Sequence, residues 1–385
     1  MTICYFETLA AFAVSCLLSA MIIPKISLIA FRRRLFDPLD DRKLHTAHIP
    51  RLGGVAFFPS IIVPISLAIA CHNLCTDSNL LNWEQSTCLL TLFSCLFILY
   101  LMGMRDDLIG MRYRAKFVIQ TLCSLLLVTS GFCFDNLYGL FGIHELPHYV
   151  GIPFTVFIIV YIMNAINLID GIDGLASGLS MIAFLAFGCM FVCLHWWLYA
   201  FISFAALGAL IPFFYYNMFG QTRRGRKVFM GDTGSLTIGL LLAVMAIHLS
   251  MSDPVKEALF PGAIVTAFSF LLVPMLDVVR VVLHRLRNHQ PPFLPDKNHI
   301  HHKFIALGMS QHQALRFILS IACLFIIANT LLASYLSVTV LFLLDVAVWT
   351  AMHFYITAKI TKKTPKKLIL HTLYFIFLFY TKIKT

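Results

Sequence analysis

Residues 196–216 read WWLYAFISFAALGALIPFFYY, and this run alone indicates the fold class. It carries no charged side chain and, at 1.5 Å rise per residue, it is long enough to cross the roughly 30 Å hydrocarbon core of a bilayer as a helix. Comparable runs recur along the chain, of whose 385 residues 59% are hydrophobic and 12% charged, and the mean hydropathy is +0.85. A soluble domain interrupts its apolar residues far more often. We therefore expect an all-α integral membrane protein.

The same pattern predicts eleven membrane-spanning helices that together form a single polytopic domain over residues 1–385. Because eleven is an odd number, the two termini are expected on opposite sides of the membrane. The predicted segments lie near residues 4–30, 53–71, 87–104, 116–134, 149–166, 174–194, 196–216, 233–250, 260–283, 315–334 and 337–358.

The distribution of Lys and Arg predicts the orientation. With the loops assigned alternately to the two sides, all 29 basic residues except Lys256 fall on one side. Cytoplasmic loops retain Lys and Arg, so we predict the N-terminus outside and the C-terminus in the cytoplasm. Residues 366–385 are too short to span and are expected to form a short tail along the cytoplasmic interface. This topology accounts for the net charge of +11, and we predict no nucleic-acid partner.

The cysteines suggest no further structure. The chain has 11 of them, most inside apolar runs, as Cys16, Cys95 and Cys323 are. Their spacing is not typical of a disulfide framework or a zinc site. We therefore expect them to behave as small buried hydrophobic residues.

Four polar clusters fall in the predicted cytoplasmic loops, and such convergence indicates a site. The first is GMRDDL at residues 103–108, where Asp106 and Asp107 end the third helix and Arg114 and Lys116 follow closely. Paired carboxylates beside cations suit a metal ion or a phosphate. A stop signal at the membrane interface explains the pair equally well, so this cluster does not decide the function by itself.

The second cluster is NAINLIDGIDGLA at residues 164–176, in a loop without any basic residue. Acidic side chains near apolar helix ends are costly unless they face protein partners, water or a cation. Asn167, Asp170 and Asp173 offer the oxygen ligands that Mg²⁺ prefers. A solvated turn, which Asp-Gly pairs favour, is the simpler alternative.

The third cluster is RKVFMGDTGSL at residues 226–236, where the eighth helix begins. A carboxylate at a helix entrance can serve as an N-cap alone. Beside the second cluster, Asp232 becomes a candidate metal ligand.

The fourth cluster is DKNHIHHK at residues 296–303, in a loop rich in proline. No cysteine or carboxylate pair completes a tetrahedral zinc set around these histidines. Hydrogen bonding to phosphate or sugar oxygens fits imidazole better, with a solvated loop as the alternative.

Together with DRKLHTAHIPRLGG at residues 41–54, these clusters resemble those of the polyprenyl-phosphate N-acetylhexosamine-1-phosphate transferase family, in its undecaprenyl-phosphate GlcNAc-1-phosphate transferase branch. The resemblance covers a catalytic core of about residues 30–316. It implies Mg²⁺-dependent transfer of an N-acetylamino-sugar 1-phosphate, GlcNAc-1-phosphate first, from a UDP-sugar to undecaprenyl phosphate with release of UMP. It also implies an enzyme of the bacterial inner (plasma) membrane that starts lipid-linked glycan synthesis, with its active site on the cytoplasmic face. A homodimer is a possible oligomeric state.

The resemblance further implies roles for individual residues. Asp106 and Asp107 match the family's acidic pair, which handles the lipid phosphate as a base or by positioning it. Asn167 and Asp232 match its ligands for Mg²⁺, with Mn²⁺ as the alternative cofactor. The family's nucleotide-loop acids match Asp170 and Asp173, which join the acidic pair as candidate catalytic residues, and its uracil partner matches Phe229. The full set of expected substrate contacts is Lys43, Arg114, Lys116, Phe229, His299, His301 and His302.

Two other functions are alternatives at this point. A muramyl-pentapeptide phosphotransferase of the same family typically has three adjacent histidines, whereas this chain has His-Ile-His-His. An ion-coupled transporter would need acids within its helices, for which Asp277 and Asp345 are the candidates. GalNAc and rarer deoxy amino sugars stay open as donor sugars, as does the glycan being built.

Overall fold

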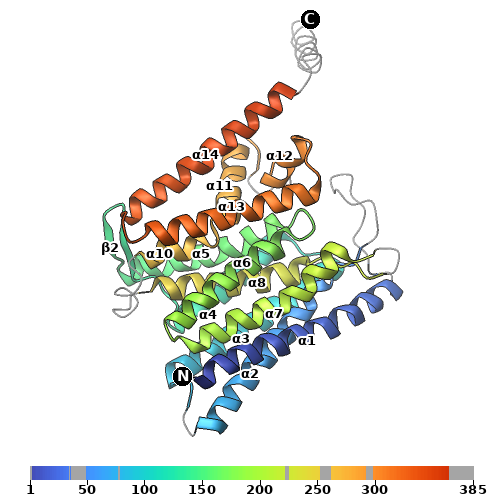
Figure 1. Cartoon of the computed structure of the whole chain (residues 1–385), viewed down its shortest axis with the longest axis vertical. Coiled ribbons are helices and arrows are strands. Elements are labelled where there is room, and N and C mark those ends of the chain that lie inside the picture. The colour runs from blue at the N-terminus through green and yellow to red at the C-terminus, as the bar shows by residue number, and fades with distance from the viewer. Residues whose placement is uncertain are drawn as a thin grey trace, which may run out of the picture.

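The computed structural model describes residues 2–33, 35, 49–76, 79–221, 225–251, 262–291 and 298–363. It is a bundle of helices, and each of the eleven predicted segments contains helix (Figure 1). Lys43 and the predicted tail 366–385 lie outside the described residues. The long helices are α1 Thr2–Arg32, α2 Phe57–Thr76, α3 Trp83–Ile109, α4 Tyr113–Thr129, α5 His148–Ile169, α6 Leu175–Cys193, α7 Trp197–Phe219, α8 Gly231–Ser250, α11 Leu272–Arg287, α13 Gln311–Leu332 and α14 Val338–Lys363. The short elements are η1 Gly53–Ala56, α10 Ala263–Ser269, α12 Ile300–Ala306 and the strands β1 Asn136–Leu140 and β2 Ile143–Glu145.

The protein is a multi-pass membrane protein. Within the described ranges, nine helices are long and apolar enough to cross a bilayer, or ten if α10 and α11 count as one bent span. Helix α4 has 17 residues, at the short end of what a bilayer needs. The count of eleven spans and the orientation of the termini therefore stay predictions.

The ninth predicted segment is not one straight helix. Helices α10 and α11 meet at an angle of 72°, whereas the sequence pattern predicted a single span over 260–283. Pro274 contributes to the break, because it lacks the N–H that would bond the Phe270 carbonyl and its ring would clash with that carbonyl. The chain instead starts a new helix at Leu272 that carries its basic residues at its end.

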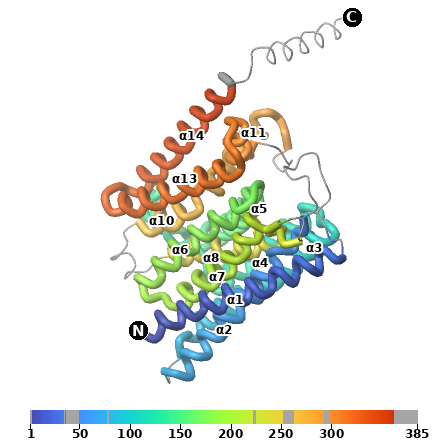
Figure 2. Tube along the Cα trace, turned by 45° about the vertical axis from the view of Figure 1, so that its right-hand side comes forward, coloured from blue at the N-terminus to red at the C-terminus, as the bar shows by residue number. Residues whose placement is uncertain are grey.

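Helix α8 lies at the centre of the bundle, packed between α3, α5 and α10 (Figure 2). Two glycines in these contacts let the backbones approach closely. A Cβ added to Gly103 of α3 would lie 2.4 Å from the Thr233 Cα, and one added to Gly239 of α8 would lie 2.8 Å from the Met163 Cα. Because α8 is surrounded, its first residues face side chains from several other helices.

Helix α1 is joined to α7 by polar side chains within the apolar contact. Ser15 and Ser19 donate hydrogen bonds to the carbonyls of Ala205 and Ala209, a common means of joining membrane helices. At the far end of α1, Ser27 donates to the Gly225 carbonyl.

The antiparallel β1–β2 hairpin was not predicted from the sequence. Phe141 and Gly142, both with positive φ, connect paired Leu140 and Ile143, as in a type I′ turn. The hairpin lies at the left in Figure 1, at the opposite end of the bundle from α12.

Candidate active site

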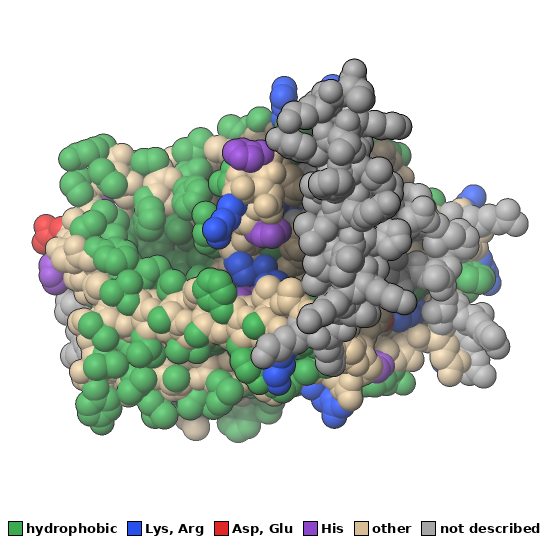
Figure 3. All heavy atoms as spheres, turned by 90° about the horizontal axis from the view of Figure 1, so that it is seen from above, with side chains coloured by type: hydrophobic (Ala, Val, Ile, Leu, Met, Phe, Trp, Pro, Cys, Tyr) green, Lys and Arg blue, Asp and Glu red, His purple; other side chains and the backbone are tan. Residues whose placement is uncertain are grey.

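Most of the predicted site residues that the structure describes gather at the end of the bundle that holds α12 and the first turn of α8. Seen from the top of Figure 1, basic and histidine side chains are concentrated toward this end, whereas hydrophobic side chains cover the other (Figure 3). The first group is centred on Lys116, whose Nζ lies 2.7 Å from Asp106 Oδ2 and 2.5 Å from Asp232 Oδ2. One cation thus bridges carboxylates that are 126 residues apart in sequence, one on α3 and one on α8.

Asn167 extends this group from the last turn of α5. Its Nδ2 donates to Asp232 Oδ1 at 3.1 Å and to Ser235 Oγ at 2.8 Å. The amide therefore presents its N–H groups to Asp232, and its oxygen could reach a cation beside Asp232 only after the amide rotates about its last bond.

Asp107 has a different environment from Asp106. Its Oδ1 accepts from the Asp232 N–H at 2.8 Å, and its Oδ2 accepts from the N–H and hydroxyl of Thr233 at 3.0 and 2.6 Å. These donors belong to the first turn of α8, whose N–H groups have no partner within the helix and therefore favour a negative charge beside them. Asp107 is therefore the cap of α8, supplied by another helix, and Asp232 itself makes no side-chain capping bond. The reading of Asp232 as a mere N-cap does not hold.

The residue before Asp232 must be glycine. Gly231 has a φ of +68°, and an added Cβ would lie 2.2 Å from the Arg51 carbonyl and 2.5 Å from Asp107 Oδ2. A side chain here would displace the carboxylate that caps α8.

The segment around Phe229 is paired with the end of the first loop. The Phe229 N–H donates to the Pro50 carbonyl at 2.9 Å, and the Phe229 carbonyl accepts from the Gly53 N–H at 3.0 Å. Val228 and Met230 are buried while Phe229 is half-buried, as expected when alternate side chains of an extended segment face opposite sides. This pairing explains why the glycines of the first-loop motif belong with the third cluster.

The Asp-Gly loop after α5 is held from the other side. Asp173 forms an ion pair with Lys227. Asn217 of α7 accepts a hydrogen bond from the Gly174 N–H at 2.6 Å and donates one to the Val228 carbonyl at 2.8 Å. Asn217 thus joins the second cluster to the third, while the Asp170 side chain stays exposed.

The histidine cluster is organised by Asp277 of α11, which is fully buried. Asp277 accepts hydrogen bonds from Arg280 at 2.8 Å and from the Ile300 N–H at 3.0 Å, and it lies 2.8 Å from His299 Nδ1. His299 is consequently engaged with Asp277. The interpretation of Asp277 as part of the site, and not of an ion path, fits these contacts.

His301 is the histidine that reaches the second cluster. It is buried, and a Cβ added to Gly171 would lie 2.2 Å from its Nε2. Neither ring nitrogen has a hydrogen-bond partner among the described residues. Burial, with the neighbouring His302 and His299, lowers the pKa of His301 to about 3, so its ring is neutral near pH 7. His302 packs beside it with 4.2 Å between ring centroids.

One predicted contact lies apart from the site. Arg114 is exposed and lies against Tyr113, with its Nε 3.3 Å from the tyrosine hydroxyl. Sequence reasoning also missed contributors, namely Arg51, Asn217, Lys227 and Thr233. Arg51 and Lys227 stand inside quoted motifs and could have been chosen from their charge, whereas nothing in the sequence marked Asn217.

Comparison with known proteins identifies the family of the chain. The family model described as glycosyl transferase family 4 matches residues 89–250. A Bacillus subtilis protein described as "Probable undecaprenyl-phosphate N-acetylglucosaminyl 1-phosphate transferase" is 31% identical over 342 residues, which are 87% of this chain and 88% of the relative. The chain belongs to glycosyl transferase family 4.

Other members of family 4 carry related descriptions. An undecaprenyl-phosphate alpha-N-acetylglucosaminyl 1-phosphate transferase from Pasteurella multocida is 34% identical over 74% of this chain and 75% of its own length. A decaprenyl-phosphate N-acetylglucosaminephosphotransferase from Mycobacterium tuberculosis is 30% identical over 71% of this chain and 70% of its own length. This family-4 protein is thus a membrane-embedded transferase.

Proposed function

We propose that this transferase moves GlcNAc-1-phosphate from UDP-GlcNAc to undecaprenyl phosphate and releases UMP, on the cytoplasmic face of a bacterial inner membrane. The observation that carries the proposal is the meeting of Asp106, Asp232, Asn167 and Lys116 at one end of the bundle. The names of the relatives support the donor and acceptor.

The donor set fits a hard divalent cation. Asp106, Asp107 and Asp232 each have a carboxylate oxygen within 4.8 Å of the others', and the ammonium of Lys116 already bridges two of these side chains. Carboxylate and amide oxygens are ligands that Mg²⁺ and Mn²⁺ accept. Mg²⁺, with Mn²⁺ as the alternative, would be held by Asp232 and Asn167 with Asp106 beside them, and it would offset the charge of the diphosphate and of the leaving UMP.

The chain's own cations address the main obstacle, which is repulsion between two phosphate-bearing substrates. Lys116 and Lys227 are placed among the acids of the site. Charges fixed in a partly dry site stabilise a phosphoryl-transfer transition state without reorganising. A phosphate monoester with a second pKa of about 6 is already largely dianionic near pH 7, so Asp106 need not remove a proton and can position the acceptor.

Two elements suit the nucleotide sugar. Phe229 is half-buried between buried neighbours on a segment held by the first loop, which gives a uracil ring a fixed aromatic face to stack on. The neutral His301, against Gly171, can donate or accept a hydrogen bond to a sugar or diphosphate oxygen. Substrate contacts by Lys43, which lies outside the described residues, and by the exposed Arg114 stay predictions.

The alternatives find less support. Asp345, the acid that a transporter would need, is buried and accepts a hydrogen bond from Asn329 Nδ2 at 3.0 Å. It is therefore a partnered helix contact between α13 and α14. The descriptions of the three relatives named above all refer to N-acetylglucosamine, and none of them mentions muramyl-pentapeptide.

UMP release by the detergent-purified protein tests the proposal. We expect release from UDP-GlcNAc only when undecaprenyl phosphate and Mg²⁺ are both present, with GlcNAc-diphosphate-undecaprenol detected by mass spectrometry. UDP-GalNAc and UDP-muramyl-pentapeptide serve as matched donors. Turnover of the pentapeptide donor alone, or no turnover of any donor, would contradict the proposed reaction.

A further inference from the structure

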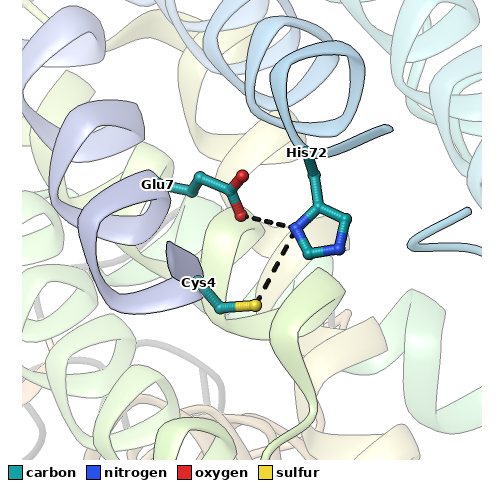
Figure 4. Close-up of side chains that lie close together, drawn as sticks. All are labelled: Cys4, Glu7 and His72. Carbon is teal, nitrogen blue, oxygen red and sulfur yellow. Dashed lines mark hydrogen bonds and ion pairs between the residues drawn. The ribbon is translucent and has the colours of Figure 1, made fainter. Parts of the chain in front are cut away.

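A second group of ligand-type side chains lies far from the transferase site, where α1 begins and α2 ends. Cys4 and Glu7 share one face of α1, three residues apart, and His72 faces them from the last turns of α2 (Figure 4). His72 Nδ1 is 2.9 Å from Glu7 Oε2 and 3.9 Å from Cys4 Sγ. Carboxylate, thiol and imidazole thus converge on one point.

The whole group is removed from solvent. The exposed fractions are 4% for Cys4, 8% for Glu7 and 8% for His72. The second carboxylate oxygen of Glu7, Oε1, is buried without a hydrogen-bond partner among the described residues. Burying a carboxylate oxygen without a partner costs free energy. The unpartnered oxygen is therefore evidence that this group binds a ligand.

A simple Glu–His ion pair does not account for all three groups. The thiol and the carboxylate both approach the same ring nitrogen, whose single proton or lone pair makes one strong hydrogen bond. The 2.9 Å distance gives that bond to Glu7, so the Cys4 thiol at 3.9 Å has no strong bond to the ring. A cation placed between the three atoms would satisfy the thiolate, the carboxylate and the nitrogen together. Within 4.8 Å of one another, the three ligand atoms can share one ion.

We propose that Cys4, Glu7 and His72 form a binding site for a borderline divalent cation of the Zn²⁺ class. Sulfur and imidazole ligands favour Zn²⁺ over Mg²⁺, which takes oxygen ligands. Three protein ligands leave the fourth position of a tetrahedral zinc to a water molecule. The ion joins α1 to α2 at this end, and the thiol proton is released when it binds.

The site is separate from the transferase chemistry. The group lies near the labelled N-terminus in Figure 1, while α1 runs away from it toward the opposite end of the bundle. There Ser27 bonds the Gly225 carbonyl, ahead of the Asp232 helix. Bound zinc therefore stabilises the N-terminal pair of helices and takes no part in the proposed reaction.

Metal analysis of the full-length protein in detergent tests this proposal. The protein is stripped with a chelator, dialysed against micromolar Zn²⁺ with excess Mg²⁺ to occupy oxygen sites, and assayed by mass spectrometry of the metal. We expect one zinc per chain in the wild type. Loss of a ligand in Cys4→Ser or Glu7→Gln lowers zinc affinity by more than about 100-fold, because even changes outside the ligand set cost 10–100-fold.

The controls use other cysteines of the same two helices. Cys71→Ser, beside His72 but exposed, and Cys16→Ser, on α1 and half-buried, should keep the full zinc equivalent. With Co²⁺ in place of zinc, wild type and both controls should show the near-ultraviolet thiolate-to-cobalt absorption that Cys4→Ser lacks. Only monodisperse fractions are compared. No zinc in the wild type, or equal zinc in Cys4→Ser, overturns the proposal, as does a cobalt spectrum without a thiolate band.

Discussion

The N-terminal ends of α8 and α12, called their entrances below, are both capped by an aspartate of another helix, but the two aspartates have different charged neighbours. In each, an aspartate from another helix accepts the N–H of a first-turn residue, Asp107 at α8 and Asp277 at α12. The hydrogen bonds that Asp107 accepts come from neutral N–H and O–H groups. Asp277 also bonds the charged Arg280 and adjoins His299. One helix entrance is thus held by dipoles and the other by an ion-pair network.

This difference predicts unequal responses to the same substitution. A carboxylate facing N–H groups can be replaced by an amide at the loss of a hydrogen bond or two. A buried carboxylate that neutralises a part-buried cation cannot, because the cation is left without its counter-charge. Substitutions at the two aspartates therefore distinguish the stability lost with hydrogen bonds alone from the stability lost with an ion pair.

The largest effect on kcat is expected for Asp232, which stands in the first turn of α8 beside the capping Asp107. Asp232→Asn keeps the shape of the side chain but removes the charge that Lys116 contacts and the proposed cation needs. We expect kcat for UMP release to fall on the order of 10³-fold, with an unchanged elution profile. Activity within a few-fold of wild type would remove Asp232 from the metal site.

Next in size is Asp277→Asn. It removes the charge of the fully buried Asp277 and leaves the part-buried Arg280, 18% exposed, without its charged partner. Breaking a fully buried pair typically costs about 3–5 kcal/mol of stability, so we expect a loss at the lower end of that range. The displacement of α12 should lower kcat about 10²-fold, since small misplacements have effects of that size.

Asp345→Asn is the matched control for Asp277→Asn. It alters another buried carboxylate, but one whose described partner is the neutral Asn329. We expect a smaller loss of thermal stability and an unchanged kcat. If Asp277→Asn kept full activity while losing stability, Asp277 would be structural only.

A smaller effect is expected for Asp107→Asn. The amide keeps one acceptor for the first turn of α8 and turns its own N–H toward the other donors, so about 1–3 kcal/mol of stability is lost. We expect a kcat reduced about tenfold, because Asp232 stays on the helix but is less firmly placed. A loss as large as that of Asp232→Asn would mean that Asp107 contacts substrate or metal directly.

The sequence allowed prediction of the helical segments and of the four polar clusters, because apolar runs and Asp-Gly or His-rich motifs are local patterns. It did not separate Asp106 from Asp107, whose different partners lie on α4 and α8 and depend on how those helices pack. The Cys4 group was likewise missed, since His72 is 68 residues away from Cys4. The break before Pro274 could not be predicted from proline alone, because Pro24, Pro64, Pro153 and Pro212 lie inside continuous helices.

The smallest expected effect on kcat is that of His301, whose contribution is to the pH dependence of stability at the α12 entrance. The pKa of His301 is lowered to about 3 in the folded protein, against roughly 6.5 in the unfolded chain. Between these values the unfolded state binds the extra proton, so the stabilisation present above pH 6.5 is lost as the pH falls toward 3. The contribution has an upper limit of about 1.4 kcal/mol per pH unit.

His301→Gln should therefore flatten the dependence of thermal stability on pH between 6.5 and 5, measured by melting scans of the detergent-purified protein. Because the wild-type ring stays neutral over this range, the acid limb of the kcat profile should not arise from His301. A melting temperature that falls equally steeply in both proteins would show that His301 gains its proton without unfolding. The ring would then be charged in the site at pH 5, and the neutral hydrogen-bonding role at the α12 entrance would have to be abandoned in favour of direct charge stabilisation.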